Sequence, residues 1–373
     1  MDVAAFVKKD YLLVISALLA LISLFFVPFD TVLSYNYGNI LKTICILLSF
    51  LLIVAALKEC KALQHVAQTV LRDTKTTTAL CLALIFLPFF CAMLFSNDVA
   101  LLTFVPFSIT VLRMAEMKGL IAVVCILQTV AANVGSYLTP FGNPHNIYIY
   151  NLHDFYGFDL WDYELELIPI VAVGTIALLA MVMLIPRKPM TVDLSEEIEI
   201  GGPKRLYVIL ALMALAVVTV LDCVPFYITA VIVVAVFLLM MPTIFRTVDY
   251  SILFVFFFLF IFANGMTNIE SVNQTLSGLM DQDPMLTTVA VSQFTSNVPS
   301  TLLLQPFTDD WAAVLVGADI GGFGTPIASM ASIITLKLYM REEDSDLKRY
   351  FKLFFLIEGM MLAVLIPTYY VFC

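Results

Sequence analysis

The sequence predicts an all-α polytopic membrane protein made of two inverted repeats, each with a re-entrant hairpin and a broken transmembrane helix. Three observations lead to this fold class: a strongly apolar composition, two polar interruptions of apolar stretches, and one motif that occurs twice. Of the 373 residues, 61% are hydrophobic and 13% are charged, and the mean hydropathy is +0.99. A soluble chain of this length cannot bury so much apolar surface. We therefore expect about nine full transmembrane helices plus two hairpins in a lipid bilayer.

The distribution of charge predicts the orientation of the chain. If Lys8 and Lys9 lie in the cytoplasm, almost all Lys and Arg residues fall in loops on the inner side. The loops on the outer side then contain acidic residues and no Lys or Arg, with Lys42 alone placed toward the outer side. This is the positive-inside bias of inserted helices. We expect a multi-pass protein of the bacterial inner membrane with a cytoplasmic N-terminus. The net charge of −10 follows from this topology and indicates no nucleic-acid partner.

The first predicted repeat covers residues 1–185. Its hairpin is recognised by the polar tip Ser96-Asn97-Asp98, which has apolar runs on both sides and basic residues beyond both runs. A segment that begins and ends on the same side of the membrane is a re-entrant hairpin, here entering from inside. The predicted elements are scaffold helices within 11–57 (11–28 and 39–57), a hairpin over 76–113, a broken helix over 119–150 and a helix over 167–185.

The second predicted repeat covers residues 226–373 and runs in the opposite direction. A cytoplasmic linker and an extra connecting helix, together 186–225, bring the chain to the outer side, so the second repeat begins outside. The tip Ser296-Asn297-Val298 is flanked by acidic residues at both ends, which predicts a hairpin that enters from outside. The predicted elements are helices within 226–264, a hairpin over 271–308, a broken helix over 311–338 and a helix over 351–372.

A repeated motif follows each hairpin. Residues 132–143 align with residues 318–329 without a gap, and Ala, Gly and Thr-Pro coincide. An internal repeat of this kind is the most informative pattern in the chain. In inverted-repeat transporters, discontinuous helices place the substrate site near the midplane of the membrane.

The two tips and the two breaks define the candidate site. Backbone that leaves helical geometry inside a membrane loses hydrogen bonds, which protein, water or a ligand must replace. Exposed carbonyls suit Na⁺, and helix N-termini suit anions. An ordinary proline kink is the alternative for each Thr-Pro, but two kinks in register with two Ser-Asn tips favour a site. The candidate binding residues are Ser96, Asn97, Asp98, Asn133, Gly135, Ser136, Thr139, Pro140, Asn143, Ser296, Asn297, Asp319, Gly321, Thr325, Pro326 and Ser329.

Four ionisable residues in apolar segments need separate interpretation. An acid within the membrane is costly and is functional by default. Asp98 at the first tip is expected to couple transport to a bound cation or proton, with a buried structural hydrogen bond as the alternative. Ser96, Asn97 and Asp98 therefore form a candidate Na⁺ site, and Na⁺ is the only cofactor we consider. Asp319 either binds ions or holds the broken helix, and Glu358 is expected to be structural. His145 is expected to be a solvated histidine of an outer vestibule, with a proton relay as the alternative.

These motifs resemble those of the ion transporter superfamily. The similar branch holds arsenite permeases, D-type sodium–proton antiporters, citrate transporters and divalent anion–sodium symporters. The resemblance rests on the tip at 96–98 and on the stretches 132–146, 292–299 and 317–332, and it covers nearly the whole chain. It implies a homodimer whose transport domain slides as an elevator against a fixed scaffold. In the dicarboxylate symporters each tip reads Ser-Asn-Thr, and here Asp98 and Val298 replace the threonines. Because Asp98 would repel a dianion unless neutralised, the resemblance favours a less charged anion or cation exchange.

We expect a secondary active transporter of a small anion, either an organic carboxylate or an inorganic oxyanion, coupled to Na⁺ or H⁺. A sodium–proton antiporter that uses Asp98 is the alternative, and a channel lined by the two hairpins is a third hypothesis. An enzyme is not expected, because the sequence contains no pattern of a nucleophile–base pair or a metal-ligand cluster. The predicted core holds no arginine, so amides, hydroxyls and helix ends would recognise the anion.

Overall fold

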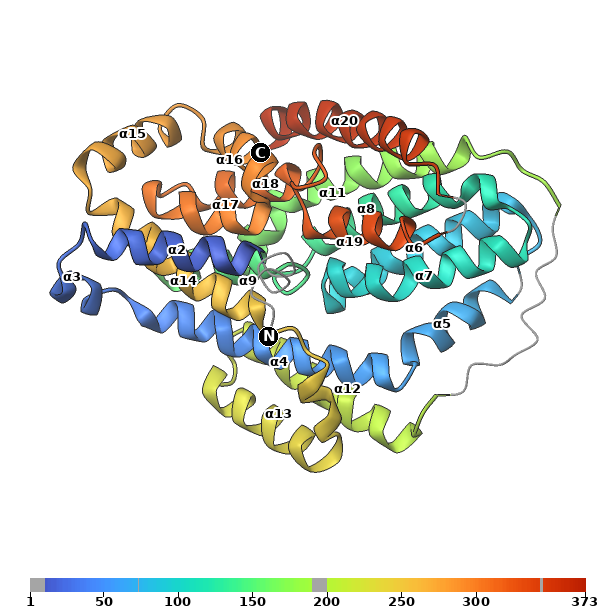
Figure 1. The fold of residues 1–373 in the computed structure, drawn as a ribbon, viewed down its shortest axis with the longest axis horizontal. Helices are drawn as coiled ribbons and strands as arrows, with labels where there is room; N and C mark the ends of the chain where they lie inside the picture. The colour runs from blue at the N-terminus through green and yellow to red at the C-terminus, as the bar shows by residue number, and fades with distance from the viewer. Residues whose placement is uncertain (1–10, 73, 190–199, 343–344) are drawn as a thin grey trace.

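The computed structural model describes residues 11–72, 74–189, 200–342 and 345–373, and its regular structure is helical (Figure 1). Within these ranges the only β pairing is an isolated bridge between Thr76 and Pro189. The prediction of an all-α protein is confirmed. Lys8, Lys9 and residues 190–199 of the predicted linker lie outside the described residues.

The helices of the first half follow the predicted order. Thr76 begins the first hairpin, because its side chain accepts a hydrogen bond from the backbone N–H of Ala79 at 3.3 Å and caps the helix. Ser96 separates the two arms, which pack against each other. The helices are α2 Tyr11–Leu24, α3 Phe29–Leu33, α4 Tyr37–Glu59, α5 Ala62–Leu71, α6 Thr77–Phe95, α7 Asn97–Met114, η1 Lys118–Leu120, α8 Ile121–Tyr137, α9 Pro144–Tyr150, α10 His153–Tyr156 and α11 Leu160–Met183.

The start of α11 corrects a predicted boundary. We predicted a helix over 167–185, but α11 begins at Leu160 because Asp159 and Asp162 form a capping box. The Asp159 carboxylate accepts hydrogen bonds from the backbone N–H groups of Trp161 and Asp162, at 2.8 Å and 2.9 Å. The acidic residues that indicated an outer loop therefore form the first turns of a helix, where negative charge is stabilising.

The second half shows a further departure from prediction. The hairpin predicted over 271–308 includes a separate helix, α15, whose axis is bent by 101° from that of α14. Asp283 caps the next helix, so the hairpin arms are α16 and α17. The helices are α12 Pro203–Val220, α13 Phe226–Met240, η2 Pro242–Arg246, α14 Ser251–Thr267, α15 Glu270–Met280, α16 Pro284–Thr295, α17 Asn297–Leu304, η3 Gln305–Phe307, α18 Trp311–Gly321, α19 Met330–Tyr339 and α20 Leu347–Phe372.

The described helices make this a polytopic membrane protein. Six of them are long and apolar enough to cross a bilayer, or seven if the bent pair α14–α15 counts as one span. These six include both arms of the first hairpin, so fewer than the nine full spans that we predicted are long enough; α2, α13, α18 and α19 are apolar but shorter. The six are α4, α6, α7, η1 with α8, α11 and α20.

The packing of the helices buries most of the first break, whereas the second break is buried at its two ends and exposes Ile327 in its middle. In each half the first hairpin arm packs on the helix that precedes the break, α6 on α8 and α16 on α18. Figure 1 shows α20 and α11 along one edge and α12 and α13 along the opposite edge, with α4 between. The first break, residues 138–143, joins α8 to α9, and all residues of α9 are buried. The second break, residues 322–329, joins α18 to α19.

Contacts between distant loops group the ends of the helices into two sets. In one set, Lys42 forms an ion pair with Asp222 at 2.7 Å, and His153 lies 3.2 Å from the same carboxylate. In the other set, Arg113 at the end of α7 forms an ion pair with Glu342, which follows α19. The charge pattern assigns the first set to the outer side and the second to the inner side.

Candidate functional site

Both hairpins turn at a serine in the same uncommon backbone conformation. Ser96 has φ 79° and ψ 147°, and Ser296 has φ 75° and ψ 152°. At each tip the following asparagine folds its side-chain oxygen back onto the chain. Asn97 accepts from the N–H of Asp98 at 2.8 Å, and Asn297 accepts from the N–H of the next residue at 3.0 Å. Positive φ is unfavourable for residues other than glycine, and such strain is concentrated at ligand sites.

Each tip is docked on the break of its own half by an equivalent backbone hydrogen bond. The N–H of Asn97 donates to the carbonyl of Gly142 at 3.3 Å. The N–H of Asn297 donates to the carbonyl of Ala328 at 2.9 Å. Gly142 and Ala328 occupy aligned positions of the repeated motif, so the same contact is made twice.

The two predicted Thr-Pro threonines make a second equivalent pair of contacts. The hydroxyl of Thr139 donates to the carbonyl of Met93 at 2.6 Å, and that of Thr325 donates to the carbonyl of Gln293 at 2.8 Å. Each acceptor lies three residues before the serine at the tip. The threonines therefore fasten the break to the first arm of the hairpin by satisfying a helix-end carbonyl.

Two glycines of the motif allow the hairpin arms to approach closely. A Cβ on Gly135 would lie 2.1 Å from the carbonyl oxygen of Phe89, and a Cβ on Gly321 would lie 2.7 Å from the hydroxyl of Ser292. Both glycines are in helices, α8 and α18, and both face the first arm of the local hairpin. Glycine is needed here for close approach of backbone rather than for conformation.

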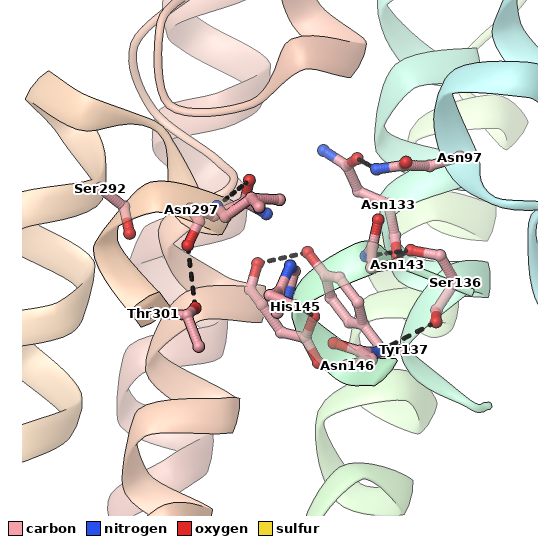
Figure 2. Close-up of polar contacts among 12 residues, drawn as sticks. Asn97, Asn133, Ser136, Tyr137, Asn143, His145, Asn146, Ser292, Asn297 and Thr301 are labelled. Atoms are coloured by element: carbon pink, nitrogen blue, oxygen red, sulfur yellow. Dashed lines mark hydrogen bonds and ion pairs between the residues drawn. The ribbon is translucent and has the colours of Figure 1, made fainter. Parts of the chain in front are cut away.

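A buried network of amides and hydroxyls extends from the first tip (Figure 2). The side-chain amide of Asn97 donates to Asn133 at 2.9 Å. The amide of Asn143 donates to the hydroxyl of Ser136 at 2.6 Å, and Ser136 donates to the carbonyl of Asn133 at 2.7 Å. These four predicted residues are each at most 4% exposed. The network therefore presents polar groups at the junction of the hairpin and the break.

His145 and Asp319 form a buried pair that connects the two halves. Nε2 of His145 lies 2.9 Å from Oδ1 of Asp319, and both side chains are fully buried. The hydroxyl of Tyr137 donates to the backbone carbonyl of Asp319. Our placement of His145 in a solvated vestibule is therefore wrong. Two atoms of the pair, Nδ1 of His145 and Oδ2 of Asp319, have no hydrogen-bond partner.

Gln293 holds the second break and was not singled out from the sequence. Its side-chain amide donates to the carbonyls of Gly321 and Phe323, at 3.1 Å and 3.0 Å. Its side-chain oxygen accepts from the N–H of Thr325 at 3.0 Å. These bonds replace those lost where α18 ends. One polar residue within an apolar arm, three positions before the tip, is the only sequence signal of this role.

The remaining predicted residues do not join these networks through their side chains. Asp98 is half-buried, and its Oδ1 is buried without a hydrogen-bond partner. The hydroxyl of Ser296 donates to the side-chain oxygen of Asn297 at 3.4 Å. The side chain of Ser329 accepts from the backbone N–H of Ala331 and so caps α19. Pro140 and Pro326 lie within the breaks and carry no polar side-chain atom.

The buried charge of the described chain is acidic. Its buried polar and charged residues include Asp319, Glu358 and His145 but no Lys or Arg. An anion bound between the tips would therefore meet amide and hydroxyl donors, and a cation or proton would have to offset the carboxylates.

Interrupted helices, two hairpin tips and unpartnered buried acids within a polytopic helical bundle define a membrane transporter. A sequence model of the citrate transporter family matches residues 4–314. The chain belongs to the citrate transporter family, which confirms the resemblance to the ion transporter superfamily. As a member of a transporter family, it is not an enzyme.

Three similar proteins are named as membrane proteins or, in one case, as a transporter. The chain is 30% identical over 299 residues to the uncharacterized transporter MJ0456 of Methanocaldococcus jannaschii, which covers 80% of each chain. It is 30% identical over 247 residues to the inner membrane protein YbiR of Escherichia coli, covering 65% of each. It is 24% identical over 351 residues to a 46 kDa membrane protein of Mycobacterium leprae, covering 83% of this chain and 81% of the relative.

Proposed function

We propose that the protein is a secondary active transporter that moves a small anion across the bacterial inner membrane, coupled to Na⁺ or H⁺. The observation that carries the proposal is the pair of hairpin tips, each docked on an interrupted helix by the same hydrogen bonds. The buried His145–Asp319 pair connects the two halves. The description of the family makes a carboxylate of the citrate class the first substrate to test.

The proposed topology is that of two inverted repeats, 1–185 and 226–373, with the N-terminus in the cytoplasm. The ends of the first hairpin contact segments assigned to the inner side: Thr77 donates to the carbonyl of Lys188, and Arg113 pairs with Glu342. Asp283, at the start of the second hairpin, accepts a hydrogen bond from Tyr370 at the outer end of α20. These contacts support hairpins that enter the membrane from opposite sides.

The proposed anion site lies at the N-termini of the second hairpin arms. α7 and α17 both begin at the asparagine of a tip, so the positive end of each helix dipole lies at the break. The first N–H of each helix already donates to a carbonyl of the break, so an anion would be held by the dipoles and the polar side chains around the tips. Na⁺ at Ser96, Asn97 and Asp98 would neutralise the Asp98 carboxylate and reduce its repulsion of the anion. Carboxylate and carbonyl oxygens are suitable ligands for a small hard cation.

The proposed mechanism is an elevator in a homodimer, as the superfamily resemblance implies. α2 packs on α14, and α4 packs on α12 and α13, which gives a candidate scaffold. The hairpins pack mainly on α8 and α18, which continue into the breaks. The hairpins together with α8, α18 and the breaks therefore form a candidate moving domain. The two groups meet where α9 contacts α4 and α14 contacts α17.

Uptake of labelled citrate into proteoliposomes tests this function. The wild type is expected to accumulate citrate above its external concentration when an inward Na⁺ or H⁺ gradient is imposed. In Asp98→Asn the Na⁺ concentration for half-maximal uptake should rise about tenfold or more, equivalent to losing about 1.4 kcal/mol of cation binding. Asp154→Asn is the matched control, because the Asp154 side chain is 89% exposed. Equilibration without accumulation or counterflow would indicate a channel instead.

A sodium–proton antiporter is the second candidate, favoured by the buried and unpartnered Oδ1 of Asp98. One carboxylate that binds Na⁺ and H⁺ in turn needs no anion. Proteoliposomes that contain a pH-sensitive dye distinguish the two functions. A Na⁺-driven change of internal pH in chloride buffer, with no citrate or oxyanion present, would show sodium–proton antiport rather than anion transport.

A further inference from the structure

Glu358 is a buried acid that none of the contacts described above uses. It lies in the middle of α20, on the buried stripe that also contains Phe354, Met361 and Leu365. Its side chain is fully buried, and no side chain donates a hydrogen bond to either carboxylate oxygen. Glu358 belongs to no sequence motif, and from the sequence we expected it to have a structural role.

The surroundings of Glu358 contain no cation in the part of the chain that the structure describes. α20 packs against α8, α11 and α18. The basic residues of α20, Lys348, Arg349 and Lys352, lie at its exposed start. Within the described residues, the titratable side chains that interact with Glu358 are Tyr137 on α8 and Tyr350 on α20. None of these can neutralise a carboxylate. An ionised acid with no partner in such an interior costs far more than taking up a proton.

Glu358 also lies beside the second break. The backbone N–H of Gly324 interacts with its carboxyl group. A Cβ on Gly324 would lie 2.9 Å from Leu362, one turn along α20 from Glu358. Gly324 has φ +109°, so this loop holds a conformation that other residues rarely adopt. A movement of the loop would therefore change the environment of Glu358 directly.

We propose that Glu358 is a proton-binding site: its carboxyl group holds a proton in the buried state seen here and exchanges it when the second break rearranges. The proposal deepens the proposed function and rests on it, because it assigns the proton of coupled transport to α20. The proton would thus bind on α20, at a different place from the candidate Na⁺ site at the first hairpin tip.

Infrared spectroscopy of the purified protein in lipid tests proton binding without any substrate. At neutral pH the wild type should show the carbonyl stretch of a buried protonated carboxyl group, and Glu358→Gln should lose that band. Glutamine mimics the shape and neutrality of the protonated acid, so this variant is expected to fold. Glu270→Gln, an exposed acid on α15, should keep the band. A band of unchanged intensity in Glu358→Gln would overturn the proposal.

Uptake of labelled citrate then tests coupling. Glu358→Gln should lose at least nine-tenths of the stimulation by an inward proton gradient while it keeps citrate counterflow, about a tenfold change. Full proton-driven accumulation in Glu358→Gln would contradict the assignment of the coupled proton to this residue. Absence of citrate, arsenite and phosphate uptake in the wild type would contradict the proposed function, whereas the infrared result would still decide whether Glu358 binds a proton.

Discussion

Removing His145 would take away the side-chain partner that lies 2.9 Å from the Asp319 carboxylate and leave only its interaction with the side chain of Asn143. Asp319 is fully buried, and its Oδ2 already lacks a partner. At the scale of single residues, this pair is a fully buried link between the two halves, because α9 belongs to the first half and α18 to the second. Deleting one partner of a buried hydrogen bond leaves the other group desolvated and unsatisfied, which is destabilising.

We predict that His145→Ala lowers the free energy of unfolding by about 1–3 kcal/mol, the cost of leaving a buried polar group unsatisfied. Asp319→Asn should cost less, because an amide can still accept or donate a hydrogen bond at the same position. The double variant should be more stable than the sum of the single effects, by about 0.5–3 kcal/mol. Thermal unfolding of the four proteins in one detergent measures this cycle.

His153→Ala is the matched control for this cycle. His153 also lies near acids, 3.2 Å from Asp222 and 3.4 Å from Asp154, but Asp154 is 89% exposed. A surface contact of this kind contributes about 0–1 kcal/mol. Strict additivity of His145→Ala and Asp319→Asn would show that the two side chains do not depend on each other.

Single residues were predictable where they belonged to a repeated pattern. Asn97, Asn133, Ser136 and Asn143 were all candidates, and the structure joins them by hydrogen bonds. His145 was misplaced because its position after Asn-Pro is typical of a loop, whereas α9 is entirely buried. Its partner is 174 positions away in the chain, and no local signal indicates a pairing across that separation.

At the scale of elements, the hairpins are held by close packing that only glycine permits. We predict that Gly135→Ala is severely destabilising, because its methyl group would lie 2.1 Å from a backbone carbonyl of α6 that cannot move freely. The cost of such overpacking is about 1–3 kcal/mol or more. Gly321→Ala should cost less, because it meets the side chain of Ser292. The shift of the unfolding temperature measures both effects.

Gly359→Ala is the control, because a Cβ at Gly359 in α20 has nothing within 4 Å. There the higher helix propensity of alanine should stabilise the protein by about 0.5–1 kcal/mol. Equal effects at Gly135 and Gly359 would mean that α8 and α6 are not in close contact. The expected order of stability is Gly359→Ala, then wild type, then Gly321→Ala, then Gly135→Ala.

Elements were predictable from apolar runs and their polar interruptions, but their ends were not. The arms of the first hairpin end at Phe95 and begin again at Asn97, as the Ser-Asn tip predicts. The start of α11 was missed because a capping box and an outer loop both use Asp. α15 was merged with the second hairpin because the bend of 101° before it leaves only the ordinary residues Asn268 and Ile269 between the helices.

At the scale of the whole molecule, the ion pairs at the loops group the helix ends into the two sets that the charge pattern predicts. The contacts of Lys42 with Asp222 and of Arg113 with Glu342 join segments far apart in the sequence. Lys42 was the one basic residue placed toward the outer side, and its partner is an acid assigned to the same side. Loop charges therefore predict sidedness, whereas the mutual packing of the two halves requires three-dimensional contacts.

Sidedness gives a prediction for the intact cell. Cys223 is exposed and follows Asp222, so a membrane-impermeant maleimide added to spheroplasts should label it. A cysteine introduced as Lys348→Cys, at an exposed position near the start of α20, should react only after lysis. Mass spectrometry assigns the label to each position, and the buried Cys81 should remain unlabelled in both preparations. Labelling of Lys348→Cys but not Cys223 in intact spheroplasts would reverse the orientation, and with it the sides from which the two hairpins enter. The direction of anion and proton transport inferred from the uptake experiments would then be reversed relative to the two sides of the protein.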